Sequence, residues 1–103
     1  MGGKSKKKDK KLDSEGLKLK GNEAFSKGDS ETALKCYTAA IDMDPANAAL
    51  YSNRAQVYIK QEEFSRAIED SDMALELNPA FTRAYIRKAT ALFEMPHIEG
   101  SLE

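Results

Sequence analysis

Two stretches of this chain repeat each other at a spacing of 34 residues, and this period limits the possible folds more than any single residue does. The repeated residues are small, aromatic or helix-breaking: Ala33 and Ala67, Ala40 and Ala74, Pro45 and Pro79, Tyr51 and Tyr85. A fixed period of this length is typical of stacked supersecondary units, each unable to bury its apolar face alone. Such stacking makes a groove, and the side chains that line the groove decide what the chain binds.

Composition and charge favour one soluble, helix-rich domain. The chain has 103 residues, of which 41% are hydrophobic and 32% are charged. Its net charge of -1 hides an asymmetry, because residues 1–12 carry six Lys and one Asp while residues 13–103 carry ten Lys and Arg against sixteen Asp and Glu. A single cysteine, Cys36, excludes an intrachain disulfide. With no secretory or membrane-spanning segment in the sequence, this favours a reducing compartment, the cytoplasm first and the nucleus second.

Apolar residues at helical spacing predict five helices, and no strand pattern competes with them. The expected helices span residues 14–27, 30–43, 47–60, 64–77 and 81–94. Asp13 or Ser14 can cap the start of the first helix, and Gly28 suits a left-handed position at its end. Residues 98–103 would begin a sixth helix that the sequence does not complete.

These elements predict an all-α fold of antiparallel helix pairs joined by short loops. The repeated small residues would let neighbouring helices approach closely. Large residues would fill the gaps between pairs: Tyr37, Tyr51, Phe64 and Tyr85. Residues 1–12 are rich in Lys and almost free of apolar side chains, so we expect them to form a disordered tail.

The order of large, small, aromatic, Ala and Pro positions resembles the tetratricopeptide repeat (TPR). The first repeat supplies Leu17, Gly21, Ala33, Tyr37, Ala40 and Pro45, the second Tyr51, Ala55, Tyr58, Ala67, Ala74 and Pro79, and the third Tyr85, Ala89, Leu92 and Ser101. Ala24 and Ser71 stand where the family usually has an aromatic residue. The resemblance implies a right-handed superhelix of about two and a half repeats in residues 13–103. The expected units are repeat one (14–47), repeat two (48–81) and a truncated repeat three (82–103).

The first helix of each expected pair carries polar residues in matching positions. Asn53 and Arg87 lie one period apart, so they occupy equivalent places on neighbouring helices. Lys18 and Asn22 are four residues apart on one helix face, as are Arg83 and Arg87. Two like charges at that spacing repel by a few tenths of a kcal/mol, which is tolerable in solvent but is also typical of an anion site. Any one of these residues alone fits an ordinary solvated helix face, whereas the set in register predicts a binding site.

These residues resemble the carboxylate clamp of co-chaperone TPR domains. We call them the donor set: Lys18, Asn22, Asn53, Arg83 and Arg87. In the family these positions bind the terminal carboxylate and an acidic side chain of a chaperone tail ending in Glu-Glu-Val-Asp. The resemblance therefore implies that the partners are the C-terminal peptides of the seventy- and ninety-kilodalton heat-shock chaperones. Arg83 stands where the family more often has Lys, so a planar fork replaces a point charge.

We interpret the chain as a co-chaperone adaptor that has no catalytic activity and needs no cofactor or metal. One His and one Cys about 60 residues apart suggest no nucleophile–base pair, and there is no zinc-ligand spacing or phosphate-binding glycine loop. Two alternatives stay open. The chain could be the targeting domain of a larger enzyme, such as a phosphatase, prolyl isomerase or ubiquitin ligase. It could also be a scaffold that binds an internal peptide.

The two ends of the chain carry further expectations. The Lys-rich tail is interpreted as a solubilising arm; membrane contact is a weaker alternative, and no nucleic-acid partner is expected. Gly2 invites N-myristoylation, but Lys6 stands where that motif needs Ser or Thr. At the other end, Leu92 and Phe93 would lack a covering helix, as would Ile98 and Leu102. A fragment of a longer protein and a short natural form both remain open, and we favour self-association through this truncated third repeat.

Overall fold

The computed structural model describes residues 13–96, and these form five helices and no strand. The helices are α2 (Ser14–Ser26), α3 (Ser30–Met43), α4 (Ala48–Lys60), α5 (Phe64–Leu77) and α6 (Thr82–Glu94). Each begins and ends within one residue of its predicted bounds, which confirms the all-α class. The predicted tail, the predicted start of a sixth helix and His97 lie outside the described residues.

Local capping explains where the helices begin and end. The Asp13 carboxylate accepts a hydrogen bond from the Gly16 backbone N–H at 2.9 Å, so Asp13 rather than Ser14 caps α2. Gly28 follows α2 with a φ of 83°, the left-handed conformation expected there. Glu62, one period later, adopts a φ of 63°, which costs a residue with a Cβ atom roughly 1–2 kcal/mol. The sequence did not indicate this second left-handed position because the residue there is not glycine.

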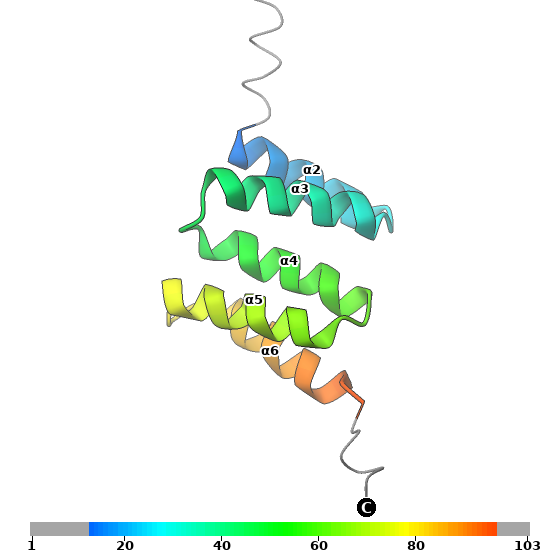
Figure 1. Ribbon diagram of the computed structural model, residues 1–103, viewed down its shortest axis with the longest axis vertical. Helices are drawn as coiled ribbons and strands as arrows, with labels where there is room; N and C mark the ends of the chain where they lie inside the picture. The colour runs from blue at the N-terminus through cyan, green and yellow to red at the C-terminus, as the bar shows by residue number, and fades with distance from the viewer. Residues whose placement is uncertain (1–12, 97–103) are drawn as a thin grey trace, which may run out of the picture.

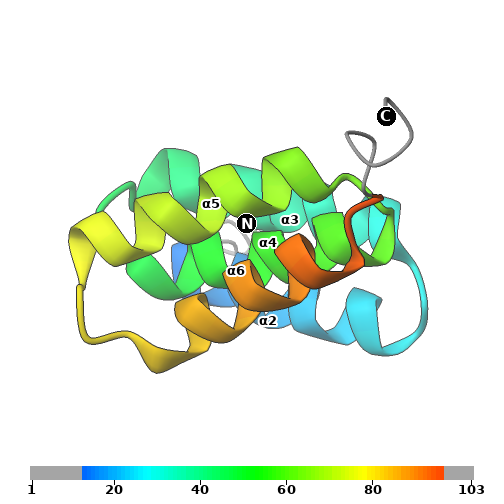
Figure 2. The same cartoon turned by 90° about the horizontal axis from the view of Figure 1, so that it is seen from below.

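The helices stack as pairs along one direction (Figure 1). α2 packs on α3, α4 packs on α5, and α6 packs on both α5 and α4. α4 also contacts α2 and α3, so it joins the first pair to the rest. Viewed from below, α3 and α5 lie on one side of the stack and α2 and α6 on the other (Figure 2). The contacts of α4 with both α2 and α6 bring these three helices, the first of each repeat, into one layer.

Small residues set the spacing of the helices, as predicted. Four repeated alanines are fully buried: Ala33, Ala40, Ala67 and Ala74. Tyr37 and Tyr51 are buried beside them and fill gaps between helices. The expectation for Tyr85 was wrong, because its side chain is 53% exposed. Tyr51 is covered by the helices that follow it, whereas no helix follows α6 within residues 13–96.

A buried ion pair that the sequence did not indicate joins α4 to α5 within the second repeat, and a further hydrogen bond from its arginine reaches the first repeat. Arg54 on α4 donates two hydrogen bonds to the Asp70 carboxylate on α5, at 2.7 and 2.9 Å, and a third to Thr38 Oγ1 on α3 at 3.1 Å. The Asp70 side chain is only 8% exposed, and its hydrogen bonds raise the pKa of Arg54 above the ordinary value. Lys88 and Asp72 lie one period after Arg54 and Thr38, and they pair at 2.8 Å. The Arg54–Thr38 contact between successive repeats therefore has a counterpart one repeat later.

We predict that Arg54→Ala destabilises the fold by about 2–4 kcal/mol, because it leaves the buried Asp70 carboxylate without its partner. Urea unfolding followed by circular dichroism measures this loss. Glu23→Ala is the control, since it breaks an exposed Glu23–Lys27 pair of 3.5 Å and should cost less than about 1 kcal/mol. Equal costs for the two substitutions would contradict a structural role for the buried pair.

Candidate functional site

The donor set lies on the layer formed by α2, α4 and α6. Lys18 and Asn22 belong to α2, Asn53 to α4, and Arg83 and Arg87 to α6. Asn22 and Arg83 are exposed, while the other three side chains are half-buried. The three helices are linked at this layer by side chains, because Asn22 of α2 contacts Asn53 of α4 and Tyr37 of α3, and the charge of Arg87 on α6 acts on Tyr37.

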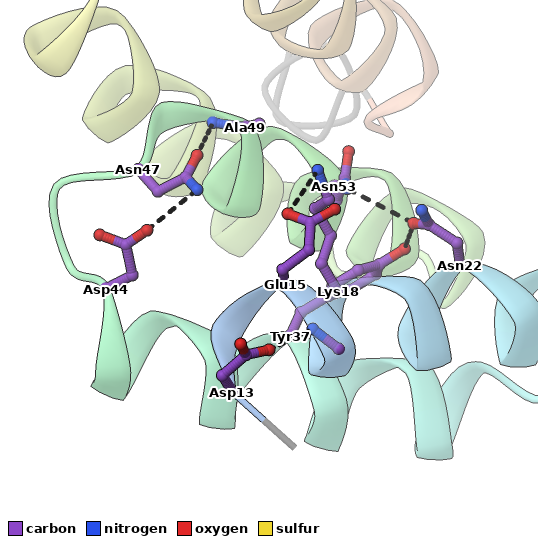
Figure 3. A network of polar contacts seen from close by, with 10 residues as sticks. Asp13, Glu15, Lys18, Asn22, Tyr37, Asp44, Asn47, Ala49 and Asn53 are labelled. Atoms are coloured by element: carbon purple, nitrogen blue, oxygen red, sulfur yellow. Dashed lines mark hydrogen bonds and ion pairs between the residues drawn. The ribbon is translucent and has the colours of Figure 1, made fainter. Parts of the chain in front are cut away.

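The two asparagines are in direct contact. Asn53 Nδ2 lies 3.5 Å from Asn22 Oδ1, and the Tyr37 hydroxyl also donates a hydrogen bond to Asn22 Oδ1 (Figure 3). These two donors occupy the oxygen of the Asn22 amide and turn its nitrogen away from them. The Asn22 Nδ2 group is thereby held as an outward-facing donor.

Tyr37 is the member of the site that sequence reasoning missed, since we had interpreted it only as a residue that fills a gap. It is 3% exposed, and its ring lies so close to α2 that a Cβ atom added to Gly21 would meet Tyr37 Cε1 at 2.6 Å. Glycine at position 21 therefore lets the ring pack on the α2 backbone and point its hydroxyl at Asn22. Burial raises the pKa of Tyr37, and the Arg87 charge partly offsets this, so the hydroxyl remains a donor at neutral pH.

Arg87 carries an unsatisfied donor. Its Nε atom is buried and has no hydrogen-bond partner among the described residues. Burial lowers the pKa of Arg87, the nearby Arg83 charge lowers it further, and Tyr37 acts in the opposite direction. An arginine nonetheless stays charged in a protein. A buried, unpaired guanidinium N–H costs free energy, and an acceptor that reached it would recover that cost.

Lys18 is paired within its own helix rather than with another member of the donor set. Its Nζ atom lies 3.5 Å from the Glu15 carboxylate, three residues earlier (Figure 3). Glu15 lies two periods before Arg83, so the two residues occupy equivalent positions on α2 and α6. This acidic side chain was not among the residues expected at the site. Simple counting of the 34-residue register could have found it.

The arrangement offers several donors and fixed positive charges on one face, which suits an anionic group with more than one acceptor atom. Within residues 13–96, no group of three or more His, Cys, Asp or Glu side chains is placed to hold a metal ion. The helices of this part of the chain are also too short and too polar for any to span a membrane.

Sequence comparison identifies the repeats. Residues 21–62 match the profile described as TPR repeat, and residues 48–81 match the one described as tetratricopeptide repeat. The second TPR of Spaghetti (RPAP3), solved bound to the HSP90 peptide SRMEEVD, has 33% sequence identity and a TM-score of 0.78, over 94% of this chain and 86% of that one. The chain belongs to the tetratricopeptide repeat family.

Other TPR proteins are similar over part of their length. The TPR2B domain of yeast Sti1, solved as a complex with pHsp70, is 46% identical with a TM-score of 0.76, covering 78% of this chain and 64% of that one. RNA polymerase II-associated protein 3 of Homo sapiens is 40% identical over 83 residues, which are 81% of this chain and 12% of the relative. Serine/threonine-protein phosphatase T of Aspergillus oryzae is 47% identical over 75 residues, which are 73% of this chain and 16% of the enzyme. The chain therefore spans less than a fifth of the length of these two curated relatives.

We predict that Tyr37→Phe destabilises the domain by about 1 kcal/mol, because it removes the hydrogen bond to Asn22 while keeping the ring on Gly21. Urea unfolding measures the loss, and the side-chain amide signals of Asn22 in NMR spectra should shift. Tyr85→Phe serves as the control: it removes a hydroxyl that donates to the Pro79 carbonyl at 3.0 Å in an exposed setting, and should cost less. Unchanged Asn22 amide signals in Tyr37→Phe would argue against this hydrogen bond.

Proposed function

We propose that this TPR domain is a protein–protein interaction module that binds the C-terminal Glu-Glu-Val-Asp tail of heat-shock chaperones of the HSP70 and HSP90 classes. The observation that carries the proposal is the buried Nε of Arg87, unpaired among the described residues and close enough for its charge to act on Tyr37, whose hydroxyl joins the amide pair of Asn22 and Asn53. Support also comes from the similarity to TPR domains that were solved with chaperone peptides. The proposed domain is residues 13–103, with repeats at 14–47, 48–81 and 82–103.

The chemistry of the tail fits the donor set. A C-terminal Asp presents two carboxylates, which accept hydrogen bonds and donate none. In the proposed complex the terminal carboxylate lies between the amides of Asn22 and Asn53 and the positive charge of Lys18. The guanidinium of Arg87 donates to the same end of the peptide, and the exposed Arg83 fork binds the second carboxylate.

The energies of these hydrogen bonds set the expected affinity for the peptide. Each hydrogen bond to a charged group contributes roughly 1.5–3 kcal/mol, and the cost of ordering a flexible tail offsets part of their sum. The resulting affinity is on the order of micromolar. The module would act in the cytoplasm or the nucleus, where the free, buried Cys36 stays reduced.

The similarity to phosphatase T supports a second candidate function, the targeting domain of a larger enzyme. Phosphatase T matches this chain over 16% of its own length, so the same kind of module occurs there beside a much larger remainder. Both candidates use the donor set in the same way. They differ in what else the full protein carries, whereas a scaffold for internal peptides would not need a free carboxylate.

We predict that the peptide SRMEEVD binds with micromolar affinity in isothermal titration calorimetry and that its C-terminal amide loses most of this binding. Arg87→Ala should weaken binding of the acid peptide by about 10- to 100-fold, because it removes one or more hydrogen bonds to a charged group. Lys88→Ala is the matched control, because Lys88 neighbours Arg87 on α6 but pairs with Asp72 instead. Equal affinity for the acid and amide peptides would rule out the carboxylate site and favour recognition of an internal peptide.

A second prediction concerns Glu15. Its carboxylate pairs with Lys18 in the free domain, in the way that a ligand carboxylate would pair with Lys18 in the proposed complex. Glu15→Gln should tighten binding of SRMEEVD by about two- to fivefold, the range set by an exposed ion pair worth up to about 1 kcal/mol. Glu23→Gln is the control, because it removes the same charge from the same helix. Glu23 pairs with Lys27 rather than Lys18, so this substitution should change the peptide affinity less. If calorimetry gives the two variants equal affinities for the peptide, Glu15 does not compete with the peptide for Lys18.

A further inference from the structure

Within residues 13–96, the buried side-chain polar atoms that lack a hydrogen-bond partner are Ser52 Oγ on α4 and Arg87 Nε on α6. Both residues lie one period after members of the donor set. Ser52 follows Lys18 by 34 residues, and Arg87 follows Asn53 by the same number. A buried donor without an acceptor costs free energy. Because α4 and α6 contact each other, one acceptor between these helices could serve both groups.

The 34-residue register identifies an amide at this place. Asn22 Oδ1 accepts hydrogen bonds from Asn53 on the next helix of the layer and from the Tyr37 hydroxyl, which leaves Asn22 Nδ2 as a donor. The residue one period after Asn22 is Gln56 on α4, which carries the same amide group on a longer side chain. Gln56 is half-buried and lies four residues after Ser52, on the same face of the helix. It therefore holds, one repeat later, the position that Asn22 holds in the donor set.

The side chain of Arg87 extends toward the helix that carries Gln56. Besides burial, which is the largest cause of the pKa shifts of both groups, Arg87 and Tyr37 each act on the pKa of the other. Tyr37 belongs to α3, and α4 lies between α3 and α6 in the stack (Figure 1). The Arg87 guanidinium therefore lies on the α4 side of α6 rather than on the far side of the stack.

Gln56 differs from Asn22 in one respect. The residue one period after Tyr37 is Ser71, and its hydroxyl donates to the Ala67 carbonyl at 2.8 Å. This short side chain is bonded within its own helix, so it does not orient the Gln56 amide as Tyr37 orients that of Asn22. The orientation of Gln56 is therefore left to donors from its own helix and from α6.

We propose that Gln56 is a sixth peptide-binding residue, whose oxygen accepts hydrogen bonds from Arg87 Nε and Ser52 Oγ in the complex and whose nitrogen donates to a carboxylate of the peptide. The two Nη groups of Arg87 donate to the same peptide. Gln56 is thus a positioning residue for Arg87 as well as a contact of the ligand. This inference rests on the proposed function, because it assigns a further residue to the same site.

Isothermal titration calorimetry with SRMEEVD and its C-terminal amide tests the role of Gln56. Gln56→Met keeps the length of the side chain and removes both polar atoms, so it should weaken binding of the acid peptide by about tenfold. Gln61→Met is the matched control, because it makes the same substitution at an exposed residue that follows α4, and it should bind like the wild type. Circular dichroism verifies that both variants are folded.

The outcomes separate this inference from the proposed function. If the wild type prefers the acid peptide and Gln56→Met binds it with wild-type affinity, the role of Gln56 is wrong and the proposed function stands. If the wild type binds the acid and the amide equally, both are wrong.

NMR of the Arg87 Nε–H group separates the two roles of Gln56. Exchange of this proton with water should slow when SRMEEVD binds to the wild type, and should slow much less in Gln56→Met. Gln56→Glu keeps an oxygen for Arg87 Nε but replaces the donor by a carboxylate. It should therefore restore the slow exchange while binding the peptide more weakly than Gln56→Met, because the carboxylates repel each other. Equal slowing in the wild type and Gln56→Met would overturn the contact between Gln56 and Arg87.

Discussion

Close contact between helices at alanine is the constraint on which the rest of this structure depends. Ala33, Ala40, Ala67 and Ala74 are all fully buried, and each lets the backbone of a neighbouring helix come near. Because the contacts recur every 34 residues, successive helix pairs are related by the same displacement. That displacement brings α2, α4 and α6 into one layer, although they are separated by α3 and α5 along the chain.

The electrostatics of this layer follow from its position. The body of the chain is acidic in sum, yet the layer of α2, α4 and α6 carries amides and positive charges, of which Lys18, Asn53 and Arg87 are half-buried. Burial without a partner is unfavourable for Arg87 Nε in the free domain, and the repulsion between Arg83 and Arg87 adds to this. In the proposed function, an anionic group would relieve both the missing hydrogen bond and the charge repulsion, whereas a neutral group would leave the repulsion in place.

Much of the fold could be predicted because its determinants are local or periodic. Helix bounds follow from capping residues such as Asp13 and from apolar spacing, and the stack follows from the period. Register alone relates Asn53 to Arg87, and the resemblance to the carboxylate clamp added Lys18, Asn22 and Arg83 to the donor set. The role of Tyr37 could not be predicted in this way. It depends on how closely α3 lies against Gly21, a distance that no spacing along the chain reports.

The sequence by itself determined the number of helices, their bounds, their pairing and the equivalence of positions one period apart, because these depend on local propensity and on repetition. Only the tertiary structure decided that the Asn22 oxygen receives two donors, that the donor Arg87 Nε has no acceptor within the described residues, and that Arg54 pairs with Asp70. It also decided that Tyr85 on α6 is exposed, whereas its counterpart Tyr51 on α4 is buried. The physical reason is that burial and hydrogen bonding depend on which helices meet in space, and a side chain's own sequence neighbours do not specify that.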